Sequence, residues 1–210
     1  MPTQATAREQ AGETNTADVV DGVNGAGGVD GAGGASGVDR AGGADGVDRA
    51  GGADGAAAID ATHYRRVLGH FPSGVTVVAS VDAEGPVGFA CQAFSALSLD
   101  PPLVLFSVGH TSTTWPRIRD TGRFCVNFLA ADHEELCRAF AVSGGDKFDG
   151  VEWHRSELGS PILSGAHGWV DCTIEATYPG GDHTIVVGRV HGLDADAESS
   201  PLIFHKGAFG

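Results

Sequence analysis

Residues 75–92, VTVVASVDAEGPVGFACQ, decide the fold class of this chain. The first seven are rich in β-branched residues and have the length of a single buried strand. Residues 82–86 are typical of a tight turn, and residues 87–92 predict a second strand. Two strands joined by so short a turn pair antiparallel. This stretch therefore predicts a β-hairpin and, with it, an antiparallel sheet.

The rest of the chain favours the same class. Further strands are predicted at 103–108, 124–129, 169–178, 183–190 and 201–205, with brief helices near 64–71, after Pro116 and over 132–141. Strands and helices do not alternate regularly, and no GxGxxG follows a strand, which argues against a doubly wound sheet with a dinucleotide site. The pattern indicates a mainly β protein, an antiparallel barrel or sandwich with a few short helices.

Composition divides the chain near residue 60. Residues 1–60 hold 15 of the 33 glycines, no aromatic residue, and three Arg against ten Asp and Glu. A nine-residue unit, GVDRAGGAD in two of its copies, repeats over 28–54. Calcium-binding β-rolls also repeat every nine residues, but here Asp replaces a required Gly, and Arg falls where an aliphatic side chain would fill the roll. We expect a disordered, acidic, low-complexity tail over 1–60 and one folded domain over 61–210.

Charge and cysteine usage exclude several functions. A net charge of −14 over 210 residues disfavours nucleic acid and anionic membrane surfaces. No stretch reaches the roughly 20 apolar residues of a membrane span, and the N-terminus has no secretory signal, so we expect a cytoplasmic protein. The cysteines are far apart and lack metal-ligand spacing, which predicts free buried thiols and no metal site: Cys91, Cys125, Cys137 and Cys172.

Three segments are polar where a purely structural β-protein has no need of polarity. Small and hydroxyl residues over 88–102 leave the backbone open to a flat ring, although an ordinary strand and loop would also fit. Four hydroxyl residues at 111–114 precede Pro116, which indicates a helix start that either caps itself or seats a phosphate. His183 opens a strand after a glycine turn, where it either meets a ligand or is solvated.

A series of sequence blocks resembles the short-chain flavin reductase family, in the family's order and in register over 61–210. The blocks are FPSGVTVV (71–78), FSALSLDPPL (94–103), the hydroxyl run from Ser112, GRFCVNFL (122–129), DKFDGV (146–151), GSPIL (159–163) and GDH (181–183). The resemblance implies an antiparallel split β-barrel, the FMN-binding split barrel, that forms a homodimer. It also implies NAD(P)H-dependent reduction of FMN or FAD, with reduced flavin passed to the oxygenase of a two-component monooxygenase.

The resemblance further implies roles for single residues. The isoalloxazine ring would be lined by Phe89, Ala90, Cys91, Gln92, Ala93, Phe94 and Ser95, with Ser98 near it. The flavin phosphate would be held by Ser112, Thr113 and Thr114. His183 would be the catalytic residue that orients the nicotinamide, with Asp182 beside it and Phe148 at the edge of the site. The chain departs from many family members at residues 91–93, where those members carry Ser, Thr or Asn.

Both ligands are anions, so an acidic protein needs local positive charge to bind them. Arg117, Arg119, Arg123 and Lys147 lie in the segments that the family uses for binding, and we expect them to supply it.

Two other functions fit the same fold. One is a flavoprotein with tightly bound FMN that serves a dedicated oxidation, and the other is a non-catalytic flavin-binding module. The GDH block argues against the second, because a mere binder needs no nicotinamide contact. The choices between FMN and FAD, and between NADH and NADPH, stay open.

Overall fold

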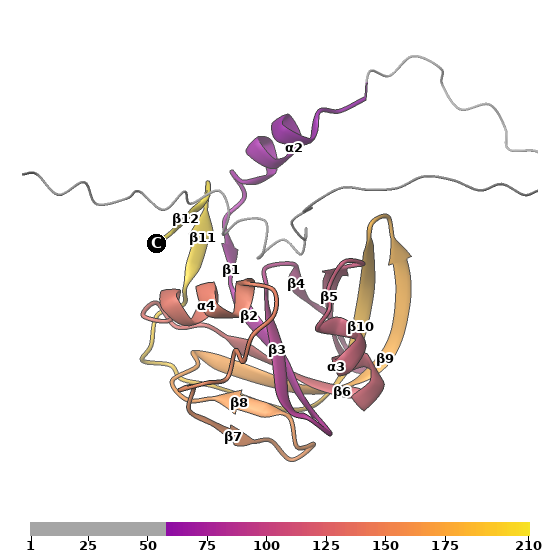
Figure 1. Ribbon diagram of the computed structural model, residues 1–210, viewed down its shortest axis with the longest axis vertical. Helices are drawn as coiled ribbons and strands as arrows, with labels where there is room; N and C mark the ends of the chain where they lie inside the picture. The colour runs from indigo at the N-terminus through magenta and orange to yellow at the C-terminus, as the bar shows by residue number, and fades with distance from the viewer. Residues whose placement is uncertain (1–57) are drawn as a thin grey trace, which may run out of the picture.

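The computed structural model describes residues 58–210 (Figure 1). Residues 1–57, most of the predicted tail, lie outside the described residues, so the predicted tail and domain boundary stay predictions. The described elements are α2 (Ala61–Leu68), β1 (Ser73–Gly74), β2 (Thr76–Asp82), β3 (Gly85–Cys91), β4 (Phe94–Leu99), β5 (Pro102–Gly109), α3 (Trp115–Thr121), β6 (Arg123–Phe128), α4 (Glu134–Ala141), β7 (Trp153–Arg155), β8 (Pro161–Leu163), β9 (Gly168–Gly180), β10 (His183–Ala195), β11 (Ile203–His205) and β12 (Ala208–Phe209).

One seven-stranded sheet forms the body of the fold, in the order β3-β2-β6-β9-β10-β5-β4. Every neighbouring pair in it is antiparallel. The β2–β3 hairpin pairs Thr76 with Cys91 and Asp82 with Gly85, as residues 75–92 predict. The long β9–β10 hairpin curves around one side of the molecule (Figure 1). The predicted mainly β, antiparallel class is confirmed.

The two edges of this sheet meet because β3 and β4 are consecutive in the chain. Only Gln92 and Ala93 separate the two strands. The backbone N–H of Ser107 donates to the carbonyl of Ala93 at 3.0 Å, and the Cys91 thiol donates to the carbonyl of Ser107 at 3.6 Å. These bonds tie the end of β3 to β5, so the curved sheet closes at this corner as a split barrel. Residues 92–93 thus form the corner at which the barrel closes, in addition to the cofactor contact that the resemblance implies for them.

Both faces of β2 are buried, which explains the nearly continuous apolar run in the sequence. Val78 faces the barrel interior with Phe106, Phe124 and Val186. Val77 and its neighbours on the other face pack in a second core under α4 and the C-terminal strands. The strand therefore lies between two cores, one inside the barrel and one outside it.

Helix α4 begins at Glu134, two residues later than predicted. The backbone N–H of Ala131 is bonded to Ser200 and that of His133 to Ala130, so this segment forms a turn before the helix can start. The smaller sheets are β1-β11-β12 and β7-β8. β11 lies within the strand predicted at 201–205, whereas β1, β7, β8 and β12 are two or three residues long and were not predicted.

Helix α2 projects from the body of the protein, and none of its residues is buried (Figure 1). Asp60 caps it by accepting from the backbone N–H of His63 at 2.7 Å. The helix ends at Leu68, so Phe71 lies beyond it and not on its predicted apolar face. Within residues 58–210, none of the helices has the length and apolar character needed to cross a membrane.

Candidate functional site

A cavity of about 590 Å³ lies between the start of β3, the loop before α3 and the loop that follows α4. It brings together three segments that are far apart in the sequence. Among the sequence-predicted site residues, Thr113, Thr114 and Phe148 line it, together with the predicted cations Arg117 and Lys147. Its other lining residues are Glu84, Pro86, Val87, Gly88, Gly144, Gly145, Asp146 and Trp153.

In the hydroxyl run before α3, one residue caps the helix and two line the cavity. The Oγ of Ser112 accepts from the backbone N–H of Trp115 at 3.1 Å, so Ser112 caps the helix and does not line the cavity. Thr114, at the N-cap position, makes no capping bond with its side chain. In the described part of the chain, the hydroxyls of Thr113 and Thr114 have no hydrogen-bond partner, which leaves two donors for a ligand.

Lys147 gives the cavity an ammonium group. Its Nζ donates to the carbonyl of Phe140 at 3.0 Å, and burial lowers the pKa of this lysine from its usual value. The adjacent Phe148 is buried and packs edge-on against Phe140 and Trp153, with ring centroids at 5.0 and 6.0 Å. The aromatic packing fixes the backbone from which Lys147 projects.

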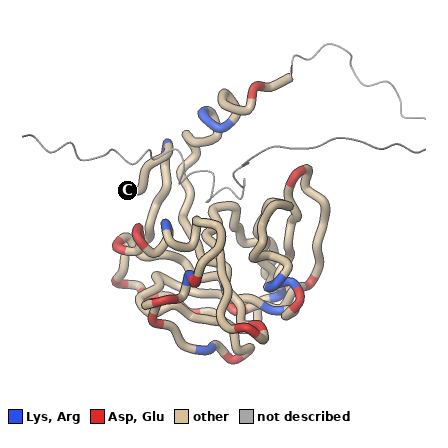
Figure 2. The backbone as a smooth tube through the Cα atoms, viewed as in Figure 1, with Lys and Arg blue, Asp and Glu red and all other residues tan. Residues whose placement is uncertain are grey.

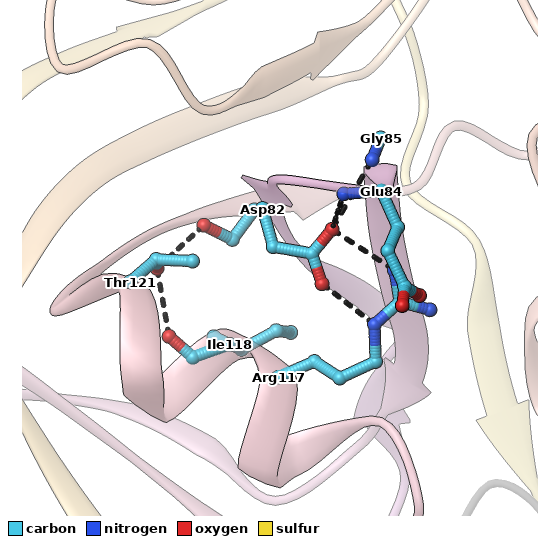
Figure 3. A network of polar contacts seen from close by, with 7 residues as sticks. Asp82, Glu84, Gly85, Arg117, Ile118 and Thr121 are labelled. Carbon is cyan, nitrogen blue, oxygen red and sulfur yellow. Dashed lines mark hydrogen bonds and ion pairs between the residues drawn. The ribbon is translucent and has the colours of Figure 1, made fainter.

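Arg117 is held by acidic side chains of the β2–β3 turn (Figure 3). Its Nε and Nη2 donate to the two carboxylate oxygens of Asp82 at 2.6 and 3.0 Å, and Nη2 lies 3.3 Å from Glu84. The hydrogen bond from Arg117 lowers the pKa of Asp82, and the same bond raises the pKa of Arg117. Most of the charge of Arg117 is therefore compensated within the protein. The sequence analysis, by contrast, expects Arg117 to supply positive charge to an anionic ligand.

Asp182 and His183 lie at the start of β10, next to the loop that leads to Thr113. His183 pairs across the sheet with Gly109, and the backbone N–H of His110 donates to the carbonyl of Asp182 at 3.0 Å. His183 Nδ1 lies 2.7 Å from the Asp182 carboxylate, and this hydrogen bond lowers the pKa of Asp182. The Asp182 carboxylate is thus one hydrogen-bond partner of the imidazole ring.

The predicted ring-binding segment presents mostly backbone, because its larger side chains turn inward. Phe89 packs on Phe106 with centroids 6.1 Å apart, and Phe94 packs on Phe128 at 5.3 Å. Ala90 and Cys91 are buried in the two opposite cores. Burial raises the pKa of the Cys91 thiol to about 12, so this cysteine is not a nucleophile at neutral pH.

The remaining residues of that segment lie at the edge of the sheet. Ala93 and Ser95 are exposed, and the Ser95 hydroxyl donates to the carbonyl of Ala96. Ser98 is half-buried beside a bulge in the β4–β5 pairing. The Nε2 of Gln92 is buried without a hydrogen-bond partner among the described residues. Since a buried amide that bonds to nothing is costly, Gln92 is suited to an acceptor on a ligand.

The residues present fit a flavin nucleotide. Thr113, Thr114 and Lys147 offer hydroxyl and ammonium donors to a phosphate, and Gln92 with the outer edge of β4 offers donors to a ring. Among residues 58–210, no group of three or more His, Cys, Asp or Glu is placed to hold a metal.

Part of the cavity wall was missed by sequence reasoning. Gly144 and Gly145 both line the cavity and have positive φ, 81° and 73°, so they form a turn in the loop that precedes Lys147. The Gly-Gly pair is the sequence signal for this turn, since two consecutive glycines indicate a loop whose backbone adopts positive φ, a conformation that other residues rarely adopt.

Comparison with known proteins identifies the family of this chain. Residues 68–210 match the family model described as a flavin reductase like domain. HsaB of Rhodococcus jostii, the reductase subunit of a flavin-dependent monooxygenase, is 48% identical over 154 residues, which cover 73% of this chain and 79% of that protein.

Two solved structures are similar as well. Nitrilotriacetate monooxygenase component B from Mycobacterium thermoresistibile is 46% identical with a TM-score of 0.69, over 71% of this chain and 84% of that one. The NADH:FAD oxidoreductase SgcE6 of Streptomyces globisporus, solved with NAD and FAD fragments, is 38% identical with a TM-score of 0.69, over 72% and 92%.

Proposed function

This chain belongs to the flavin reductase-like family, and from that premise we propose that it is an NAD(P)H:flavin oxidoreductase. It transfers a hydride from NADH or NADPH to FMN or FAD and supplies the reduced flavin to a separate monooxygenase component. The observation that carries the proposal is the meeting of Thr113, Thr114 and Lys147 in one cavity, next to the loop bonded to Asp182.

The flavin phosphate is held at that cavity. The free hydroxyls of Thr113 and Thr114 donate to its oxygens, and the Lys147 ammonium pairs with its charge. A bound dianion also stabilises the charged form of Lys147, which offsets the effect of burial on the pKa of that lysine. Arg117, already paired with Asp82, positions the turn and contributes little free charge.

The ring system lies along the segment from Phe89 to Ser98. Strand β4 is an edge of the sheet, so its outer backbone groups face no other strand among the described residues. Those groups and the Gln92 amide can donate to the ring edge where negative charge develops. When bound, the flavin and the nicotinamide nucleotide supply the hydride acceptor and the hydride donor.

His183 orients the nicotinamide and does not transfer a proton. Asp182 fixes the imidazole ring through Nδ1, so the ring presents a constant face to the nucleotide. Hydride transfer needs near-contact of two rings, and small errors of placement are costly. Holding the nucleotide is therefore the contribution expected of this residue.

Steady-state oxidation of NADH and NADPH, with and without added FMN or FAD, tests this function. We expect oxidation to require free flavin. Oxidation that proceeds at full rate without added flavin, by a protein purified with its own flavin, would favour the tightly bound FMN alternative. A folded protein that binds flavin but oxidises neither nucleotide would favour the non-catalytic module.

We also propose that the protein is a homodimer. The exposed apolar side chains of the N-terminal segment have no partner in the described chain: Ile59, Tyr64, Val67, Leu68 and Phe71, with exposures of 74, 54, 50, 52 and 79%. Leu99, 92% exposed, lies on the edge strand β4. An apolar helix face left in water is typical of an interface with another chain.

Sedimentation velocity of the full chain is expected to give twice the monomer mass. The double substitution Leu68→Ser and Phe71→Ser should weaken the dimer at least tenfold, because both side chains lose apolar area that only a partner can cover. Tyr178→Ser, a substitution at an exposed aromatic residue on β9, serves as the control. A monomeric parent would contradict the dimer.

We propose that the tail is dispensable for turnover. Deletion of residues 1–57 is expected to leave kcat/KM for NADH and flavin within twofold, because every residue assigned to the site lies after residue 83. A tenfold loss of kcat/KM in the truncated protein would show that the tail contributes to turnover.

We also propose that the protein is cytoplasmic. The four cysteines are free and buried, as expected for a protein of a reducing compartment.

A further inference from the structure

A second cavity, of about 600 Å³, adjoins the cavity assigned to the flavin phosphate. It lies between the end of β2, one face of α3, the start of β6 and the end of β7. Arg117 lines both cavities, so they are neighbours across a single side chain. Thr113, Thr114 and Lys147 do not line the second cavity, so an occupant of it leaves the residues assigned to the flavin phosphate free.

The acidic residues of the second cavity, Asp82 and Asp120, are already paired. Asp82 accepts two hydrogen bonds from Arg117 (Figure 3). Asp120 accepts two from Arg119, the shorter at 2.8 Å. Acidic and basic residues lie side by side around α3 in this way (Figure 2). Neither aspartate is therefore available to neutralise the other arginines of the cavity.

Arg123 and Arg155 keep their charge uncompensated. Neither forms an ion pair within residues 58–210; Arg155 donates to the neutral carbonyl of Gly159 at 3.1 Å, and the Nε of Arg123 is buried without a hydrogen-bond partner. A Cβ added at Gly159 would lie 3.8 Å from Arg155 and 3.9 Å from Arg123. The two guanidinium groups therefore flank one point, and a single carboxylate there can reach both.

The N-terminal part of the chain carries the opposite charge. Residues 9–39 contain six acidic side chains and no basic one: Glu9, Glu13, Asp18, Asp21, Asp30 and Asp39. Asp39 precedes Ala58, the first described residue, by 19 positions, and a chain of that length spans at most about 65 Å. A domain of about 150 residues has a radius of gyration of only about 15 Å. The acidic segment can therefore reach the cavity from its point of attachment.

We propose that the second cavity binds carboxylates of the chain's own acidic segment, residues 9–39. Guanidinium and carboxylate groups match in geometry, because parallel N–H donors face two oxygens. Exposed pairs of this kind are weak in isolation, but a tethered carboxylate is present at an effective concentration on the order of millimolar. The inference does not depend on the proposed function. It agrees with turnover that is independent of the tail, since the residues assigned to the flavin phosphate stay free.

Paramagnetic broadening of amide signals in the full chain tests the inference. Ser36→Cys places one reactive thiol in the acidic segment, because the four native cysteines are buried and burial raises the pKa of each thiol. A nitroxide attached there should broaden the backbone amide signals of residues 121–123 and 155–159. Sodium chloride at about 0.5 M should reduce this broadening about threefold, since salt screens exposed charge pairs.

Two variants of the labelled chain separate specific docking from random collision. Arg155→Gln should reduce the broadening about threefold, because one of the two guanidinium groups is lost. Arg189→Gln is its matched control, since Arg189 is paired with Glu175 and lines neither cavity. The double substitution Asp30→Asn and Asp39→Asn removes the carboxylates that flank the label. It should also reduce the broadening, and it leaves the folded domain unchanged in sequence.

Absence of broadening at residues 121–123 and 155–159 in the labelled parent would overturn the inference. Broadening of equal strength in the parent, the Arg155→Gln variant and the tail variant would overturn it as well, because the contact would then not depend on these charges. Titration with inorganic phosphate covers the other source of an anion. Signals that respond to phosphate but not to the labelled segment would assign the cavity to a free anion and contradict docking of the tail.

Discussion

A protein with alanine in place of Gly188 is expected to lose about 3 kcal/mol of its free energy of unfolding. A Cβ at this position of β10 would lie 2.5 Å from the Cζ of Phe124 and 3.2 Å from the Cβ of Cys172. Phe124 is fully buried and packs edge-on against Phe106, with centroids 5.2 Å apart. Because 2.5 Å is far shorter than a van der Waals contact, the buried ring or the strand must shift to admit the methyl group.

Urea unfolding followed by tryptophan fluorescence measures this loss, with Gly74→Ala as the control. Gly74 has no atom within 4 Å of an added Cβ and a negative φ, so its substitution should be nearly neutral. Equal unfolding midpoints for the Gly188→Ala variant and the parent would contradict the packing described for the barrel interior.

Replacing His183 with alanine is expected to raise the KM for NADH about thirtyfold, equivalent to the loss of about 2 kcal/mol of binding. The imidazole ring, fixed by Asp182, is proposed to orient the nicotinamide. The flavin phosphate is assigned to other residues, so the affinity for flavin should change less than twofold. The effect should therefore appear in the nicotinamide parameters alone.

His191→Ala is the matched control, because His191 also lies on β10 but is exposed and bonded to Thr173 at 2.9 Å. Steady-state kinetics with varied NADH and with varied flavin separate the two parameters. An unchanged KM for NADH in the His183→Ala variant would contradict this role and would favour the alternative, a solvated residue after a turn.

The parts of the fold that could be predicted are those in which one strand carries its own pattern. The β-branched run at 76–82 lies between two cores, and the turn at Asp82–Gly85 closes the hairpin within one residue of the predicted turn. Thr113, Thr114 and Phe148 line one cavity, but the ligand roles that the family resemblance implies for them stay predictions. The roles assigned to the ring-binding segment and to His183 stay predictions.

The parts that could not be predicted depend on contacts between distant segments. Arg117 is expected from the sequence to serve a ligand, but Asp82, 35 residues earlier, holds it. Arg155 has no local signal, since its place beside Arg123 depends on the β7–β8 hairpin folding against the barrel. Closure of the sheet at Gln92 and Ala93 is likewise a property of the whole barrel, because it requires Ser107 of β5.

Anaerobic mixing of the protein with excess NADH and a large molar excess of flavin tests the central claim most directly. A reductase that releases its product should bleach the flavin absorbance completely, over many turnovers of each protein molecule. Bleaching that stops at one equivalent of flavin per protein would contradict release of reduced flavin and would assign the protein to the tightly bound class.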